Sequence, residues 1–187
     1  MNIETKFLNV LKIKTYTKEE KNPSLDSFII NPVSLEFGVD RIALETGDEI
    51  PFILFNKRNN EFSALKIDLE DSLNEKLLKE ISVIVKKEDP NNLYCYFGPS
   101  LSFANIPVSR NVIKKVMDLG YKAAVKKTNN VDYLDLQVLN VEMLRKVGIP
   151  FKNITISNFD TFEMEPYLYS KKRGDAKSNI TTIELTK

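Results

Sequence analysis

Apolar and polar positions alternate along several short segments of this chain, which is the pattern of half-buried β-strands. Residues 57–60, with the sequence KRNN, have the composition of a turn, so the apolar segments on either side of them should pair as a β-hairpin. Strands are expected at residues 4–16, 25–30, 41–44, 51–55, 61–69, 93–97, 154–157 and 180–185.

Elsewhere the apolar period lengthens to three or four residues, which is typical of amphipathic helices. This pattern predicts helices at residues 71–86, at residues 109–119, and from about residue 135 to the residues before Gly148. Asp71 or Ser72 could cap the first of these helices. Because there is no internal repeat and no long linker, we expect one mixed α/β domain over residues 1–187.

The composition excludes several kinds of chemistry. The chain has no histidine and one cysteine, Cys95, among its 187 residues. A Ser-His-Asp triad, a Cys-His dyad, an imidazole metal ligand and a CxxC zinc site are therefore all ruled out. Cys95 lies in an apolar strand pattern with no histidine to activate it, so we interpret it as an inert core thiol.

Charge and hydropathy bear on compartment and partners. The 27 basic and 26 acidic side chains nearly balance, which argues against nucleic-acid binding through bulk positive charge. The first residues lack the basic and apolar regions of a signal peptide, and no segment is apolar enough to span a membrane. We therefore expect a cytoplasmic protein that binds neither nucleic acid nor membrane.

Several motifs in order resemble the laccase-domain family, also called the peptidoglycan-editing-factor or multicopper-polyphenol-oxidase-like family. Its members carry T-A-D-C-x-P before an apolar strand, followed by a hairpin that leads into H-A-G-W. Here TGDEIP stands at residues 46–51 and KIDL at residues 66–69. Glu49 and Lys66 keep the seventeen-residue spacing between the family's cysteine and histidine.

The resemblance continues to the C-terminus. GPSL at residues 98–101 is similar to the family's G-P-S-I turn, and LDL at residues 134–136 is similar to its L-D-L. Residues 154–157, 169–174 and 180–185 resemble its closing strand, its S-Y-R-R-x-G loop and its last strand. The likeness starts near residue 25, so the N-terminal part is expected to be shortened.

This resemblance implies a four-layer α-β-β-α sandwich. It also implies purine-nucleoside phosphorolysis or adenosine deamination at a zinc site of two histidines and one cysteine, and a role in cell-wall precursor editing has been proposed for the family. In this chain Glu49 stands at the cysteine position and Lys66 at the second histidine position. An ammonium is no zinc ligand at neutral pH, so we expect no metal and no cofactor.

Two groups of residues are candidates for the remaining chemistry. Glu49 could act as a general base tuned by Lys66, or Lys66 could bind phosphate. Alternatively the two form a charge pair that fills the vacated site, either directly, within about 4 Å of each other, or through one water. Asp48 stands at the position of the family's aspartate, so it could belong to the vestigial site, or it could simply cap its turn. Lys172 and Arg173 could receive an anionic ligand, or could belong to a solvated loop.

We therefore interpret the chain as a catalytically degenerate member of this family, a pseudoenzyme that binds or regulates. Its partner would be a small nucleoside or phosphate-like ligand, or another protein. The alternative is a metal-independent enzyme of the purine nucleoside phosphorylase type, acting on inosine or adenosine with phosphate, because phosphorolysis mainly requires phosphate binding and leaving-group stabilisation.

Overall fold

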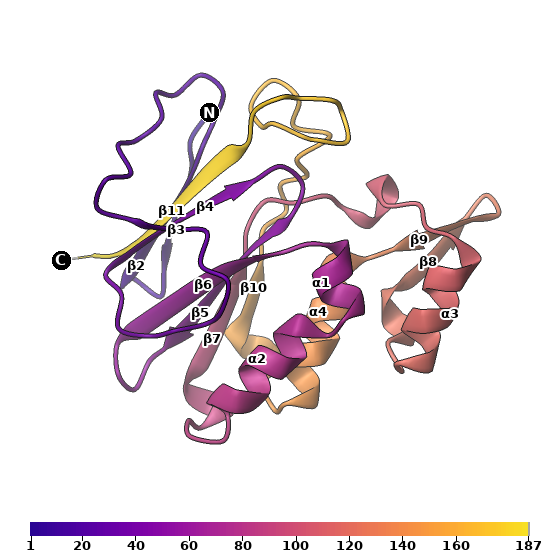
Figure 1. The fold of residues 1–187 in the computed structure, drawn as a ribbon, viewed down its shortest axis with the longest axis horizontal. Coiled ribbons are helices and arrows are strands. Elements are labelled where there is room, and N and C mark those ends of the chain that lie inside the picture. Colours follow the sequence, from indigo (N-terminus) through magenta and orange to yellow (C-terminus); the bar gives the residue numbers. More distant parts are fainter. Residues whose placement is uncertain (187) are drawn as a thin grey trace.

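The strands form two main sheets and one small one in the computed structural model, which describes residues 1–186 (Figure 1). The first sheet has the order β1-β2-β11-β4-β3, the second has the order β10-β7-β5-β6, and β8 pairs with β9 alone. The strands are β1 (Ile3–Phe7), β2 (Leu11–Tyr16), β3 (Ile29–Ile30), β4 (Arg41–Thr46), β5 (Ile50–Asn56), β6 (Glu61–Ile67), β7 (Leu93–Phe97), β8 (Val125–Thr128), β9 (Val131–Leu134), β10 (Ile154–Ile156) and β11 (Asn179–Leu185).

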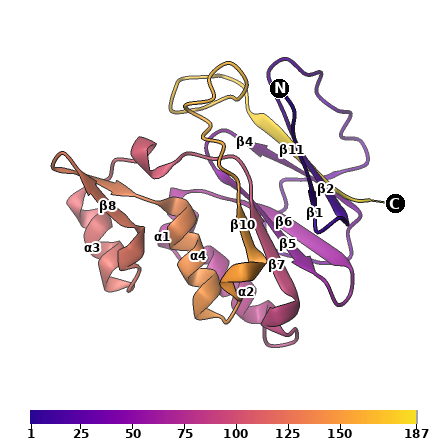
Figure 2. The same ribbon diagram turned by 180° about the vertical axis from the view of Figure 1, so that it is seen from behind.

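The helices gather on one side of the second sheet, where Figures 1 and 2 show them from front and back. The α-helices are α1 (Leu69–Leu73), α2 (Lys76–Ile84), α3 (Arg110–Asp118) and α4 (Leu136–Lys146). Four short 3₁₀ turns connect the elements, namely η1 (Pro90–Asn92), η2 (Phe103–Asn105), η3 (Lys122–Ala124) and η4 (Phe151–Asn153).

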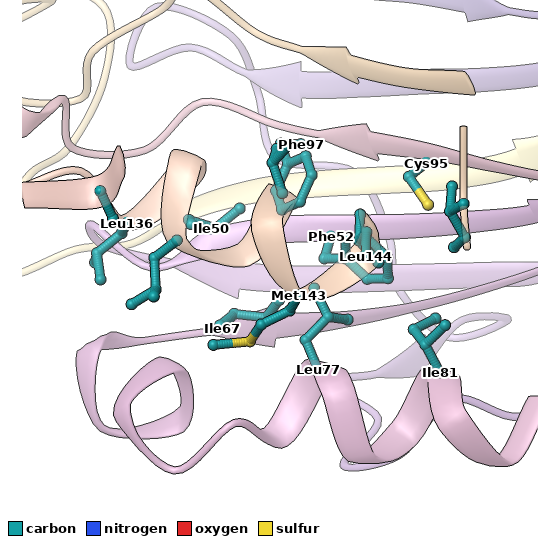
Figure 3. Close-up of a cluster of buried hydrophobic side chains, with 14 of the residues drawn as sticks. Ile50, Phe52, Ile67, Leu77, Ile81, Cys95, Phe97, Leu136, Met143 and Leu144 are labelled. Atoms are coloured by element: carbon teal, nitrogen blue, oxygen red, sulfur yellow. The ribbon is translucent and has the colours of Figure 1, made fainter. Parts of the chain in front are cut away.

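Strand β5 is buried along its whole length because it faces two cores. Phe52 points to the core between the second sheet and the helices, together with Leu77 of α2 and Met143 of α4 (Figure 3). Leu54 belongs to the same core. The alternate residues Ile53 and Phe55 point to the core between the two sheets. A continuous apolar run is the expected sequence of a strand covered on both faces.

The fold is the expected mixed α+β fold of a single domain with two stacked sheets. The expected number of layers was wrong, because residues 1–186 contain a helical layer on one side only, giving β-β-α. The outer face of the first sheet carries polar side chains such as Lys12, Lys14 and Glu184, whereas Leu11 and Ile13 point inward. A face of this composition needs no helix to cover apolar surface.

Two expected elements are each divided by residues in the left-handed conformation. Residues 4–16 form a hairpin of β1 and β2, because Leu8 and Asn9 have φ of 53° and 62° and reverse the chain. The helix expected at 71–86 is broken at Glu75, which has φ of 53°. Its first part begins earlier than expected, with Asp68 rather than Asp71 or Ser72 as the cap.

The remaining elements follow the sequence pattern with one omission. The structure confirms the predicted hairpin of β5 and β6, the predicted strand β7, and the predicted helices α3 and α4. The strand expected at 25–30 is reduced to Ile29–Ile30. The hairpin of β8 and β9 was not expected, because lysine and threonine dominate β8 and hide its short apolar pattern. No helix within residues 1–186 combines the length and apolar character needed to cross a bilayer.

Candidate functional site

The main candidate site is a cleft of about 300 Å³ where both sheets and the helical layer meet. Its polar edge comes from the turn between β4 and β5, from the residue that caps α1, and from the loop before β11. Its apolar wall comes from the segment after β7 and from the start of α4. The residues that line the cleft include Asp48, Glu49, Asp68, Leu69, Leu101, Asn105, Ile106, Leu136, Lys171 and Lys172.

Glu49 is the most constrained polar residue of this cleft. Its carboxylate accepts hydrogen bonds from the backbone N–H groups of Gly47 and Asp48, at 2.6 and 3.1 Å, and lies 2.7 Å from the Lys171 ammonium. Burial disfavours the charged carboxylate, but the bond from Lys171 and the backbone N–H groups outweigh burial and lower the pKa of Glu49 below its usual value. Glu49 is therefore held as an anion.

The ion pair depends on a glycine beneath it. A Cβ atom at Gly47 would lie 2.5 Å from Cγ of Lys171 and 2.8 Å from its Cε, which is closer than atoms can approach. The side chain of Lys171 thus crosses the backbone at Gly47 on its way to Glu49. Any larger residue at position 47 would displace it.

Asp48 joins two loops that are remote in the sequence. One carboxylate oxygen accepts a hydrogen bond from the Thr161 hydroxyl at 2.7 Å, and the other accepts one from the backbone N–H of Lys172 at 2.8 Å. The carboxylate of Asp48 therefore bonds to other loops rather than to its own turn, and it fixes the backbone that presents Lys171 and Lys172 to the cleft.

The expected direct pairing of Glu49 with Lys66 was wrong. Lys66 donates a hydrogen bond to the carbonyl oxygen of Glu45 at 3.2 Å, and no ion pair joins it to Glu49 in the described part of the chain. Lys66 lies opposite Pro51 in the hairpin, whereas Glu49 precedes β5 and folds back over its own turn. The partner of Glu49 comes instead from position 171, which belongs to a basic run whose contacts the sequence could not reveal.

Of the two residues proposed to receive an anion, only Lys172 lines the cleft. The guanidinium of Arg173 donates hydrogen bonds to the carbonyl oxygens of Thr161, Phe162 and Leu168 and pairs with Asp175. These contacts occupy the fork that would have received a ligand. Arg173 therefore holds the loop together rather than binding from it.

A second carboxylate that the sequence did not single out supports the opposite wall. Asp160 accepts hydrogen bonds from the backbone N–H of Ser102 at 2.9 Å and from the side-chain amide of Asn105 at 3.0 Å. Burial opposes its ionisation, but these bonds and the N–H of Glu163 lower its pKa. Only tertiary contacts reveal this role, because residues 102 and 160 are far apart in the sequence.

The residues present do not fit the zinc site that the resemblance implies. The chain has no histidine, and Glu49 already satisfies its oxygens with Lys171 and two N–H groups. Cys95 is fully buried in β7, and that burial raises the pKa of its thiol. Within residues 1–186, no three side chains of the types His, Cys, Asp and Glu are grouped closely enough to hold a metal ion.

Comparison with known proteins supplies a family match. The family model described as "multi-copper polyphenol oxidoreductase laccase" matches residues 43–182. This range includes every lining residue of the cleft named above. A search of curated proteins finds no match.

Solved structures share the fold at low sequence identity. The hypothetical protein YfiH of Bacillus licheniformis has a TM-score of 0.77 and 14% identity, covering 94% of this chain and 93% of that one. Protein NMB0706 of Neisseria meningitidis, assigned to family DUF152, has a TM-score of 0.76 and 14% identity, covering 100% and 99%. YlmD of Geobacillus stearothermophilus has a TM-score of 0.70 and 18% identity, covering 81% of this chain and 59% of that protein.

Proposed function

Because this chain belongs to the multi-copper polyphenol oxidoreductase laccase family, we propose that it keeps the family's cleft as a binding site and has lost the family's zinc chemistry. The observation that carries this proposal is the ion pair of Glu49 and Lys171. It occupies the position that corresponds by resemblance to the family's cysteine ligand, and residues 1–186 offer no other group of side chains that could hold a metal.

The ligand we propose is a small nucleoside or phosphate-like molecule. Leu69, Leu101 and Ile106 provide an apolar wall suited to a base, and the volume of about 300 Å³ fits a molecule of that size. Lys172 is exposed at the opposite edge, where its ammonium can meet an anionic group. A cleft with one apolar wall and one cationic edge favours such an amphipathic ligand.

The properties of Glu49 favour binding over catalysis. An efficient general base has a pKa near the working pH, whereas the pKa of Glu49 is lowered further from neutrality. A carboxylate that is paired with Lys171 and accepts two backbone N–H groups has little remaining basicity. We therefore propose a binding or regulatory role for the chain, in which ligand occupancy of the cleft is the signal.

Phosphorolysis without metal is the second candidate. It is favoured by the exposed Lys172 at the edge of the cleft, because its ammonium can hold a phosphate beside a bound nucleoside while Lys171 stays paired with Glu49. In this case the protein would release a free purine base when nucleoside and phosphate are both present.

One titration distinguishes the two candidates. Inosine, adenosine and guanosine are added to the full chain, each with and without phosphate, while calorimetry follows binding and chromatography follows free base. Saturable binding without base release supports the binding role, and base release supports the enzyme. Lys172→Gln should weaken binding about tenfold, whereas Lys177→Gln, in the same loop but outside the cleft lining, should not. No binding by any nucleoside or by phosphate would contradict both.

A further inference from the structure

The positive charge of this chain is concentrated in one segment. Residues 90–134 contain six basic side chains and two acidic ones, Asp118 and Asp132, which leaves 21 basic and 24 acidic side chains elsewhere. The balanced total therefore hides one strongly basic region in an otherwise slightly acidic chain. Net charge alone led us to expect no nucleic-acid binding, but that argument applies to the total and not to its distribution.

The fold collects most of this segment into one projecting unit, the basic lobe, which we define as residues 103–134. Figures 1 and 2 both place α3 and the hairpin of β8 and β9 at one end of the molecule, outside α1 and α4. Val116, Tyr121 and Leu134 bury the inner side of the lobe against the helical core. The outer side is left to solvent and carries the charge.

The basic lobe contains no paired cation in the described part of the chain, whereas some cations around the cleft and the first sheet are paired with carboxylates. Lys14, Lys18 and Lys171 each form an ion pair with a carboxylate. In contrast, no lobe cation has a carboxylate within 4.0 Å in residues 1–186. These lobe cations are Arg110, Lys114, Lys115, Lys122, Lys126 and Lys127. Their charge is therefore available to an external anion.

Aromatic side chains lie among these cations. Tyr133 of β9 stands opposite Lys126 of β8 in the hairpin register, so the two share a face. The turn η2, which carries Phe103, packs against β9, and 37% of Phe103 is exposed. Unpaired cations beside accessible rings are the combination that binds single-stranded nucleic acid, because the cations neutralise phosphates and the rings stack on bases.

We propose that the basic lobe binds single-stranded nucleic acid, independently of the ligand in the cleft. The contacts are of two kinds. Lysine and arginine side chains release counterions from the phosphates, which supplies most of the affinity, and Phe103 with Tyr133 supplies stacking without sequence preference. The lobe contributes Asn105 and Ile106 to the wall of the cleft, but none of its six cations lines the cleft, whose cationic edge is formed by Lys171 and Lys172.

The test uses fluorescence anisotropy of a labelled oligouridylate of about 12 nucleotides, titrated with the full chain over a range of salt starting near 50 mM. The variant Lys114→Gln/Lys126→Gln/Lys127→Gln should bind about tenfold or more weakly and should lower the slope of log affinity against log salt by about 2. Its control, Lys86→Gln/Lys87→Gln/Lys152→Gln, makes the same charge change at exposed positions outside the lobe and should bind like the original chain.

The proposed stacking of bases on Phe103 is tested with one variant and one matched control variant. Phe103→Ala should weaken binding about fivefold or more, whereas Phe151→Ala, which removes an exposed ring at the other end of α4, should have no effect. Circular dichroism of each variant confirms that it is folded. Unchanged affinity of the lobe variants would overturn the proposal, as would an equal loss in the two controls.

Other polyanions test the choice of ligand. Polyglutamate and vesicles containing phosphatidylserine carry negative charge without bases, so they should compete only weakly with the oligonucleotide. If either binds the lobe as tightly, or if Phe103→Ala affects all ligands equally, the lobe is a docking surface for an acidic protein or a membrane, and the proposal is wrong. An absence of oligonucleotide binding near 50 mM salt would also overturn it.

Discussion

Lys171 crosses the backbone at Gly47 and brings its ammonium 2.7 Å from the carboxylate of Glu49, which lies 122 positions earlier in the sequence. This ion pair joins the loop before β11 to the turn between β4 and β5. The side chain of Glu49 is 17% exposed and that of Lys171 is 58% exposed, so water screens one end of the pair. Its contribution to stability should be small, and its importance lies in where it holds the loop.

A double-mutant cycle measures this contribution. Glu49→Ala, Lys171→Ala and the double variant should show a coupling free energy of about 0.2–1 kcal/mol in urea unfolding, because one partner is largely solvated. Glu49→Ala alone should cost more than Lys171→Ala, since it also removes the acceptor of two backbone N–H groups. Coupling between Glu49 and Lys66, measured in the same way, should be near zero; a large value would contradict the observed contacts.

Gly47→Ala should break the ion pair without altering either charged residue. The added methyl group would occupy the position of the Lys171 side chain, which must then move away. We expect the coupling between Glu49 and Lys171 to vanish in the Gly47→Ala background and nucleoside or phosphate binding to change with it. Gly174→Ala is a useful contrast, because its Cβ would meet no atom within 4 Å although its φ of 92° imposes backbone strain. A persistent coupling in Gly47→Ala would show that Lys171 can reach Glu49 by another route.

Arg173→Lys should destabilise the protein although it keeps the charge. The guanidinium donates to three backbone carbonyl oxygens and to Asp175 at once, and an ammonium cannot reproduce this arrangement. The expected loss is about 2–3 kcal/mol in the free energy of unfolding, measured by urea denaturation. Lys177→Ala, at an exposed position of the same loop, should change stability by no more than about 0.5 kcal/mol. Equal effects of the two substitutions would rule out the structural role of Arg173.

Acid should weaken the fold through Asp175. The backbone N–H of Ser170, together with Arg173 and Lys18, lowers the pKa of Asp175 from 3.8 to about 2. When the pKa of a carboxyl group is lower in the folded state than in the unfolded state, the ionised group stabilises the folded state at any pH above the unfolded-state pKa. This stabilisation is lost as the pH falls to the folded-state pKa. The free energy of unfolding should therefore fall between about pH 4 and pH 2, and Asp175→Asn should flatten this part of the profile. Parallel profiles for the two proteins would contradict this assignment.

Zinc should not bind at the cleft. Titration of the protein with Zn²⁺, followed by calorimetry and by elemental analysis after dialysis, should find no stoichiometric metal, because Glu49 is paired with Lys171 and no imidazole exists in the chain. The variant Lys171→Ala frees the carboxylate but still leaves one ligand where three are needed, so it too should bind no zinc. Stoichiometric zinc in either protein would mean that other residues assemble a site.

Local patterns in the sequence were enough to locate most of the elements. The continuous apolar run of β5 and the 3.6-residue period of α4 reflect which faces of each element are buried, and burial leaves its mark on neighbouring residues. No pattern in the sequence indicates the breaks at Leu8 and Glu75. Neither residue is a usual choice for the left-handed conformation, so the hairpin of β1 and β2 and the division between α1 and α2 required tertiary contacts.

The absence of histidine by itself determined that the zinc site implied by the resemblance could not form, because ligand chemistry is a property of residue type. Which cation pairs with Glu49 was decided only by the tertiary structure. Sequence spacing paired Glu49 with Lys66, but spacing along a hairpin does not say where a side chain before the strand turns. The backbone N–H groups of its own turn and the approach of Lys171 determined that direction. The same holds for Arg173. The sequence shows its positive charge, but its structural role depends on three backbone carbonyl oxygens that come close to it only in the folded chain.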